Sequence, residues 1–192
     1  MTVSSRREQT KIQNRETILV AARQVFAQLG FAAATVRDII RATPLASGTF
    51  YNYFKSKEEV YQALRDEVAL KIRPRLREAR HQASTREEFL AASFRAFFQF
   101  VAEDRGEAQP VPERFRMDSP EVLAGFAELR EDIAAAMTRG LLPATDAGAL
   151  GAALTGVAFE LAERVKAGAD VEAMTGFATA LFLGGVEALP KA

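Results

Sequence analysis

Small and hydrogen-bonding side chains are concentrated in one stretch of the chain, from residue 35 to residue 57. In its second half, Ser47 and Asn52 are interspersed with two apolar anchors, Phe50 and Phe54. A short helix of this composition would pack against its own domain along one edge and present hydrogen-bonding groups along the other. The major groove of DNA admits a single helix and offers donors and acceptors on its floor. The stretch therefore predicts a helix that enters the major groove.

The flanking residues predict that this helix is the second of a helix–turn–helix pair. Thr35 is a suitable N-cap, with Asp38 as the acid of a capping box, and Pro44 then forces a turn. The recognition helix is expected over about residues 46–53. An earlier helix is expected over about residues 10–29, with a glycine as its natural stop.

Several positions in this stretch have a chemistry that suits DNA. Ser47 and Thr49 are short enough to reach base edges or phosphates. Thr35 and the amides that follow it can bind a phosphate at a helix N-terminus. Arg37 adds a positive charge but equally suits a surface ion pair, and Asn52 equally suits a simply solvated position. The small core that fixes the recognition helix is expected to contain Phe26, Ile39, Leu45, Phe50 and Phe54.

The charges of the chain are unevenly distributed. The whole chain has 25 basic and 25 acidic residues, so its formal net charge is zero. Residues 1–57 contain nine lysines and arginines and three acids, whereas residues 58–192 contain sixteen basic and twenty-two acidic residues. A basic N-terminal region followed by an acidic remainder is typical of a phosphate-binding domain joined to a domain that does not bind phosphate. Chance clustering of solvated charges is the alternative interpretation.

The composition argues against several other kinds of site. The chain has no cysteine, which rules out disulfides, thiolate zinc sites and cysteine nucleophiles and suits a reducing cytoplasm. It has a single histidine, no phosphate-cradling glycine-rich loop and no nucleophile motif, so we expect neither an enzyme nor a metal or cofactor site. No stretch resembles a signal peptide or is apolar enough to span a bilayer, so we expect a cytoplasmic protein without membrane contact.

Apolar periodicity predicts an all-α fold. Hydrophobic residues make up 48% of the chain, so a sizeable core is available. We expect about nine helices, divided between a three-helix DNA-binding domain over residues 1–55 and a larger helical bundle over residues 56–192. Capping boxes at Ser56–Glu59 and Ser84–Glu87 begin two of the bundle helices. The bundle helices are expected over about residues 57–81, 84–104, 115–117, 120–141, 146–167 and 170–189.

The order of residues between 11 and 60 is a more specific signal. Ile18-Leu19 is followed by Phe26, Gly30-Phe31 and Thr35-Val36, and then by Gly48-Thr49-Phe50-Tyr51-Asn52-Tyr53-Phe54 and Ser56-Lys57-Glu58. This stretch, a little over a quarter of the chain, resembles the DNA-binding domain of the TetR family of bacterial transcriptional regulators. The turn departs from the family pattern, because Pro44 and Ala46 stand where the family usually has a glycine and a helix-capping serine. Ala46 cannot cap the next helix, and the loss of such a cap typically costs about 1 kcal/mol.

The resemblance implies further roles. In the family, the residues that match Tyr51 and Tyr53 hydrogen-bond phosphates, and the residue that matches Lys57 lies against the DNA backbone. The resemblance also implies a homodimer that binds double-stranded operator DNA and is released by a small-molecule inducer bound in the C-terminal domain. Two-fold symmetry would place the two recognition helices about one DNA turn, roughly 34–36 Å, apart.

Two sets of C-terminal residues are candidates for the inducer pocket and the dimer face. An apolar pocket suited to an aromatic or acyl inducer could be lined by Phe94, Phe97, Phe98, Phe115, Met117 and Phe126. A filled core is the alternative interpretation of each of these residues. In the last two helices, which are rich in small residues, the dimer face could be formed by Leu154, Val157, Leu161, Phe177, Leu181 and Phe182.

The sequence therefore predicts a ligand-responsive, DNA-binding transcriptional regulator, most simply a repressor. A competing hypothesis is a helical protein-interaction module in which residues 35–57 are only a packing unit. An enzyme is a third hypothesis, which the composition disfavours. Sequence-dependent, salt-sensitive binding to DNA distinguishes the first hypothesis from the other two.

Overall fold

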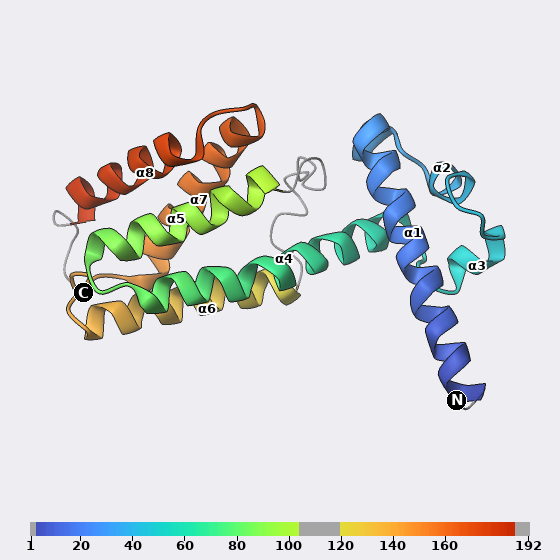
Figure 1. Cartoon of the computed structure of the whole chain (residues 1–192), viewed down its shortest axis with the longest axis horizontal. Coiled ribbons are helices and arrows are strands. Elements are labelled where there is room, and N and C mark those ends of the chain that lie inside the picture. The colour runs from blue at the N-terminus through green and yellow to red at the C-terminus, as the bar shows by residue number, and fades with distance from the viewer. Residues whose placement is uncertain (1–2, 104–119, 187–192) are drawn as a thin grey trace. The chain divides into compact units, whose positions relative to one another are not determined.

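The computed structural model describes residues 3–103 and 120–186, and within these ranges the chain forms helices and no strands (Figure 1). The predicted all-α fold is therefore confirmed. The described helices are α1 (Val3–Ala33), α2 (Val36–Arg41), α3 (Ser47–Tyr51), α4 (Lys57–Gln82), α5 (Arg86–Glu103), α6 (Pro120–Thr138), α7 (Ala147–Lys166) and α8 (Val171–Val186). The short helix predicted around Phe115 and Met117 lies outside the described residues.

The described residues form two compact units, which share helix α4. The N-terminal unit comprises residues 3–67, and the C-terminal unit comprises residues 68–103 and 120–186. The division by contacts falls within α4, whereas the predicted functional boundary lies at residue 55, just before this helix. That functional boundary stays a prediction.

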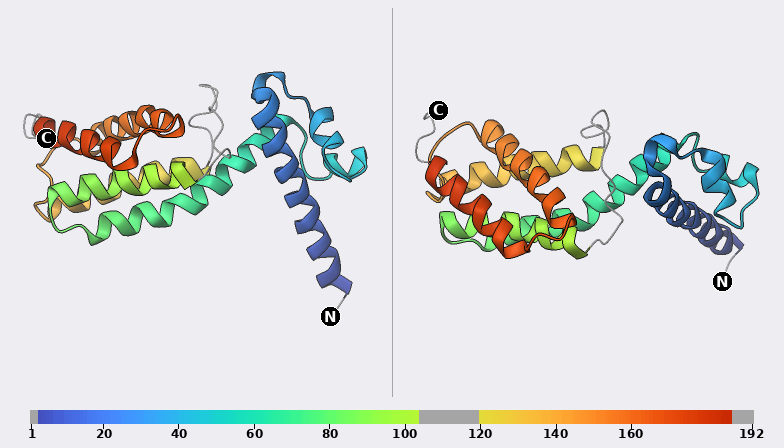
Figure 2. Two further views of the ribbon diagram at one scale, coloured as in Figure 1. Left: turned by 45° about the horizontal axis from the view of Figure 1, so that its top comes forward. Right: turned by 90° about the horizontal axis from the view of Figure 1, so that it is seen from above.

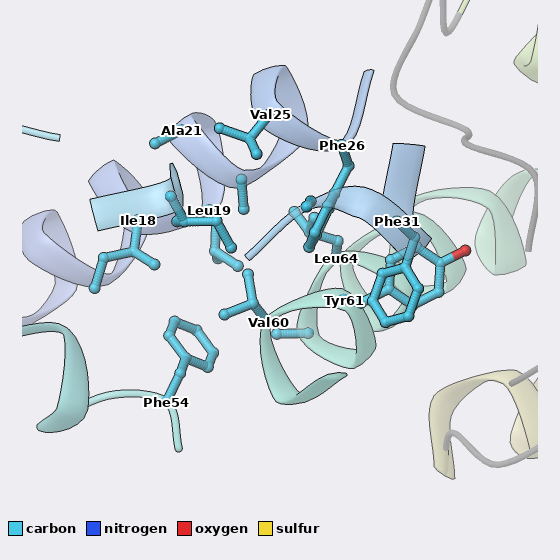
Figure 3. Packing of buried hydrophobic residues seen from close by; sticks show 14 of the residues in the cluster. Ile18, Leu19, Ala21, Val25, Phe26, Phe31, Phe54, Val60, Tyr61 and Leu64 are labelled. Atoms are coloured by element: carbon cyan, nitrogen blue, oxygen red, sulfur yellow. The ribbon is translucent and has the colours of Figure 1, made fainter. Parts of the chain in front are cut away.

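One apolar stripe of α1 provides much of the core of the N-terminal unit (Figure 3). Ile18, Leu19 and Phe26 are almost completely buried, at 0–1% exposure. The rings of Phe31 and Tyr61 pack against Phe26, with centroids 5.4 and 5.8 Å from its own. Because Tyr61 belongs to α4, this cluster holds the first turns of α4 against α1.

Helix α1 begins earlier than predicted and is interrupted at its predicted end. It begins at Val3 rather than near residue 10, and it continues past Gly30 to Ala33. The helix is broken at Gly30, where φ is 73° and ψ is 154°, a conformation that L side chains rarely adopt. Gly30 therefore stops the regular helix as predicted, and a further helical turn over residues 31–33 carries Phe31 into the core.

Helix α5 is the central element of the C-terminal unit. Phe89, Leu90, Phe94 and Phe98 are at most 2% exposed. The helix packs against α8 and α7, and α7 packs in turn against α6 (Figure 1, Figure 2). The C-terminal unit is thus built around one strongly apolar helix.

The start of α5 differs by one residue from the prediction. The hydroxyl of Thr85 accepts a hydrogen bond from the backbone N–H of Glu88 at 3.1 Å. The Glu88 carboxylate accepts in return from the backbone N–H groups of Ser84 and Thr85, at 2.7 and 3.2 Å. The predicted Ser84–Glu87 capping box is therefore wrong, because the shift by one residue lets a single carboxylate satisfy two amides.

A ladder of ion pairs joins the C-terminal part of α4 to α6, which lies beside it (Figure 2). Arg73 binds Glu121 and Glu128, with N–O distances of 2.6 and 2.5 Å. The hydrogen bonds from Arg73 lower the pKa of Glu128, so this carboxylate is charged at neutral pH. Arg80 Nε donates to Asp132 Oδ2 at 2.7 Å, and both side chains are at most 4% exposed. Breaking such a buried pair typically costs about 3–5 kcal/mol, so the ladder holds the two helices in one register.

Candidate nucleic-acid interface

Helix α2 begins with the capping box that the sequence predicted. The backbone N–H of Asp38 donates to Thr35 Oγ1 at 3.2 Å, and the backbone N–H of Thr35 donates to Asp38 Oδ2 at 3.0 Å. The Thr35 hydroxyl also donates to this carboxylate oxygen, at 2.5 Å. The hydrogen bonds from Thr35 hold the pKa of Asp38 below its usual range, so the carboxylate is ionised at neutral pH. The structure gives Thr35 a capping role, and its contact with a phosphate stays a prediction.

Helix α3, the predicted recognition helix, has only five residues, Ser47–Tyr51. As predicted, Ala46 at its N-cap provides no side-chain hydrogen bond. Thr43 stabilises the preceding turn: its hydroxyl donates to the carbonyl of Ile40 at 2.9 Å and accepts from the backbone N–H of Leu45 at 3.2 Å. An uncapped helix of this length is not stable by itself, so its conformation depends on its packing.

The two predicted anchors provide that packing. Phe50 is 1% exposed and Phe54 is 5% exposed, and both belong to the core of the N-terminal unit (Figure 3 shows Phe54). Ile39 of α2 is also buried there, and Leu45 packs against the same cluster. The predicted core around Phe26 is therefore confirmed, and it fixes α3 within the unit.

The opposite edge of α3 is open to solvent. Tyr51 is 59% exposed, with its ring edge-on to Phe50 at a centroid distance of 5.4 Å. Among the predicted DNA contacts, the exposed residues are Thr35, Arg37, Ser47, Tyr51 and Asn52, and the partly buried ones are Thr49, Tyr53 and Lys57. A phenol, an amide and a hydroxyl group on one edge, near an exposed guanidinium, can hydrogen-bond both phosphates and base edges.

The structure gives Lys57 partners within the N-terminal unit, and its place against the DNA backbone stays a prediction. Its ammonium group donates to three backbone carbonyls at the end of α1, those of Phe31, Ala32 and Ala34, at 2.8, 3.2 and 2.8 Å. It also lies 4.7 Å from the centroid of the Phe31 ring. A lysine ammonium has three N–H donors, and all three have partners within the unit. Lys57 therefore holds the start of α4 to the end of α1, where carbonyls lack helical partners.

An acid that no sequence motif singles out pairs with two arginines of the basic N-terminal region. Glu67 of α4 binds Arg15 Nη1 at 3.5 Å, and it also binds Arg23. These partners are 52 and 44 residues away in the sequence, so no local pattern identifies them. The Arg15 guanidinium also lies 5.6 Å from the centroid of the Phe54 ring. Arg15 thus has partners inside the unit.

The predicted pocket residues differ in their burial. Phe94 and Phe98 are 2% and 0% exposed, and their rings stack with centroids 5.9 Å apart. Phe97 is half-buried and meets the ring of Phe159 edge-on at 5.6 Å. Phe126 is also half-buried, and Phe115 and Met117 lie outside the described residues. Phe94 and Phe98 therefore belong to a packed aromatic core, whereas Phe97 and Phe126 retain accessible surface.

The predicted dimer residues do not share one surface. Leu154 is 5% exposed and belongs to the core of the C-terminal unit. Val157, Leu161 and Phe182 pack partly against that core, whereas Phe177 and Leu181 are 59% and 52% exposed. The predicted residues are the larger apolar residues of α7 and α8, and most of them pack in or against the core of the C-terminal unit.

A different set of residues covers the solvent side of the last two helices. On α8 the exposed stripe contains Ala173, Gly176, Phe177, Ala180, Leu181 and Gly184, and on α7 the exposed residues include Ala152, Gly156 and Phe159. We call this set the α7–α8 surface. On α8 each member has another member three or four residues away, so they lie on one face of that helix.

The described helices hold neither a metal cluster nor a membrane span. No three His, Cys, Asp or Glu side chains among those residues are arranged to bind a metal ion. None of the helices in the described ranges combines the length and the apolar composition that crossing a bilayer requires.

Solved structures of bacterial regulators share this fold along most of the chain. The fatty acid degradation regulator FadR from Bacillus halodurans is 25% identical, with a TM-score of 0.70 over 90% of this chain and 96% of its own. The regulator FadR from Bacillus subtilis, in complex with stearoyl-CoA, is 23% identical, with a TM-score of 0.73 over 89% of this chain and 98% of its own. AibR, in complex with isovaleryl coenzyme A and operator DNA, is 14% identical, with a TM-score of 0.65 over 88% and 97%.

A helix–turn–helix with an anchored, outward-facing second helix, joined to a helical bundle, defines a DNA-binding regulatory protein. The family described as "Bacterial regulatory proteins, tetR family" matches residues 18–64, which contain α2, α3 and the start of α4. In these residues the chain therefore resembles TetR-family regulators, and it shares its fold with the regulators named above.

We predict that Lys57→Ala destabilises the N-terminal unit, because three carbonyls of the α1 end lose their donor. The expected loss in the free energy of unfolding is about 1–3 kcal/mol. The chain has no tryptophan, and its three tyrosines all lie in the N-terminal unit, so tyrosine fluorescence during urea unfolding reports that unit alone.

Lys55→Ala is the matched control, because Lys55 is an exposed lysine two positions earlier. Its unfolding midpoint should equal that of the wild-type protein. An unchanged midpoint for Lys57→Ala, together with weaker DNA binding, would contradict the structural role and favour a direct phosphate contact.

Proposed function

We propose that this protein is a cytoplasmic, ligand-responsive repressor that binds operator DNA as a homodimer. In this proposal, residues 1–55 bind DNA and residues 56–192 bind the ligand and form the dimer. The observation that carries the proposal is helix α3, which is anchored by Phe50 and Phe54 and open along its polar edge. The excess of basic residues in the same part of the chain provides the electrostatic attraction that phosphates require.

The proposed contacts follow from the side chains of the exposed edge. Ser47 and Asn52 hydrogen-bond base edges, Tyr51 donates its hydroxyl to a phosphate, and Arg37 adds a charge that attracts the backbone. Thr35, Thr49 and Tyr53 complete the set of proposed contacts. Lys57 acts indirectly, by holding α4 and α1 together beside the recognition helix.

Tyr51→Phe is expected to weaken DNA binding about 10-fold or more, because a hydrogen bond to a charged oxygen contributes about 1.5–3 kcal/mol. The DNA is a duplex that the purified wild-type protein selects from a random-sequence library, and affinity is measured by fluorescence anisotropy at several salt concentrations. Tyr61→Phe is the matched control, because Tyr61 is a buried tyrosine of the same unit.

The two outcomes of this experiment have different meanings. Failure of the wild-type protein to select any sequence would reject DNA binding and favour an interaction module. Wild-type selection with unchanged affinity for Tyr51→Phe would reject only the proposed role of Tyr51.

We infer that the α7–α8 surface forms the two-fold interface. It contains exposed Phe177 and Leu181, and a Cβ atom added at Gly156, Gly176 or Gly184 would meet no described heavy atom within 4 Å. Glycine inside a helix is unfavourable by about 1 kcal/mol relative to alanine. Close approach of a helix from a second copy would explain these glycines, since small residues allow helices to pack at short distances.

Phe177→Glu is expected to shift the protein from dimer to monomer, because it introduces an unpaired charge into the proposed apolar interface. Sedimentation equilibrium measures the molecular mass over a range of protein concentrations. Leu123→Glu is the matched control, because Leu123 is an apolar residue of α6 that is 50% exposed outside the α7–α8 surface. A Phe177→Glu protein that dimerises as strongly as the control would place the interface elsewhere.

The ligand that we propose is an acyl group carried as a coenzyme A thioester. The C-terminal unit supplies apolar side chains for an acyl chain, including half-buried Phe97 and Phe126, and residues Phe94, Phe98, Phe115 and Met117 are the other proposed lining residues. Two proteins of the same fold, FadR from Bacillus subtilis and AibR, form complexes with stearoyl-CoA and isovaleryl coenzyme A. The acyl-CoA class is therefore the first to test.

Acyl-CoA esters of increasing chain length are added to the complex of the protein with its selected duplex. One range of chain lengths should lower DNA affinity about 5–150-fold, which corresponds to the usual coupling free energy between ligand and DNA sites. Free coenzyme A is the matched control and should have no effect, because it lacks the acyl chain. If every ester leaves DNA affinity unchanged, or free coenzyme A acts equally well, the proposed ligand class is wrong.

A further inference from the structure

Nothing in the described residues requires a glycine at Gly48, the second residue of α3. Its backbone φ is ordinary, unlike that of Gly30, Gly140 and Gly168, where φ is 73°, 74° and 101°. A Cβ atom added at Gly48 would meet no described heavy atom within 4 Å. By contrast, a Cβ atom at Gly151 would come into van der Waals contact with an isoleucine side chain, at 3.5 Å.

Glycine at this position also disfavours the helix in which it lies. Glycine is among the poorest helix-forming residues, because its backbone loses the most conformational freedom on folding. Helix α3 already lacks a side-chain cap at Ala46. Alanine at position 48 would therefore stabilise the free protein without a clash in the N-terminal unit, and the reason for glycine must be sought in what approaches from outside.

The open space beside Gly48 lies along the edge of α3 that is proposed to face DNA. Residues three and four positions apart share a helix face, so Gly48 lies on the same face as Tyr51 and Asn52. Both of these residues are exposed, as is the preceding Ser47. Gly48 is thus a gap in a row of hydrogen-bonding side chains.

We propose that Gly48 is the position at which the backbone of α3 comes into van der Waals contact with base edges in the major groove. This inference rests on the proposed function. A methyl group at Gly48 would hold the helix away from the groove floor and lengthen the hydrogen bonds of Ser47 and Asn52. Hydrogen bonds weaken steeply with geometry, whereas attraction to phosphates acts over about 8–10 Å. The added methyl group should therefore weaken sequence-specific binding more than nonspecific binding.

The test compares Gly48→Ala and Gly48→Val with the wild-type protein on the selected duplex and on a scrambled duplex of the same composition. Ala27→Ser is the matched control, because it also adds one heavy atom at an exposed helical position of the N-terminal unit, on α1 and outside residues 35–57. Tyrosine fluorescence during urea unfolding measures the stability of the unit for each variant.

Gly48→Ala should bind the selected duplex at least about 10-fold more weakly, which corresponds to the loss of one good base contact. Its binding to the scrambled duplex should change less than about 2-fold, because the phosphate contacts remain. Gly48→Val should lose more specific affinity, and the unfolding midpoint of Gly48→Ala should equal or exceed that of the wild-type protein.

Two results would overturn the inference. Gly48→Ala with wild-type affinity for the selected duplex would show that nothing approaches the backbone there. A lowered unfolding midpoint would show that the glycine serves packing within the unit. If the wild-type protein itself does not distinguish the selected duplex from the scrambled one, the proposed function fails, which is a separate result.

Discussion

The proposed function depends on a helix that is not stable by itself. Helix α3 has five residues and no side-chain cap, so its conformation depends on the burial of Phe50 and Phe54 in the core beneath it. The same core contains the apolar stripe of α1 and the first turns of α4. A change that loosens this core would therefore also loosen the surface that is proposed to contact DNA.

The basic residues of the N-terminal unit have two different uses. Lys57, Arg15 and Arg23 have partners within the unit and stabilise the packing of α1 with α4. Arg37 and Lys55 are exposed, where they can attract phosphates without giving up an internal contact described in this structure. The number of basic residues in this part of the sequence thus overstates the charge available to DNA, because Glu67 neutralises part of it and the ammonium group of Lys57 is held at backbone carbonyls.

Local patterns in this sequence predict the helices well and their distant partners poorly. The Thr35–Asp38 capping box joins residues three apart, and the structure contains it. The contact of Lys57 with the Ala34 carbonyl spans 23 residues, and no periodicity reveals it. Helices α7 and α8 carry apolar residues on several sides, so their composition does not distinguish buried Leu154 from exposed Phe177. Composition likewise does not identify the predicted inducer pocket, since a phenylalanine suits a filled core and a ligand site equally well.

Hydrogen–deuterium exchange of the free and DNA-bound protein tests most directly whether residues 35–57 form the DNA-binding surface. Peptides from this range should exchange more slowly when the selected duplex is bound, because DNA covers α3 and the adjoining turn. Peptides from α6 should exchange at the same rate in both states. Protection confined to other segments, such as the arginine-rich residues 73–80 of α4, with unchanged exchange in residues 35–57, would contradict this assignment.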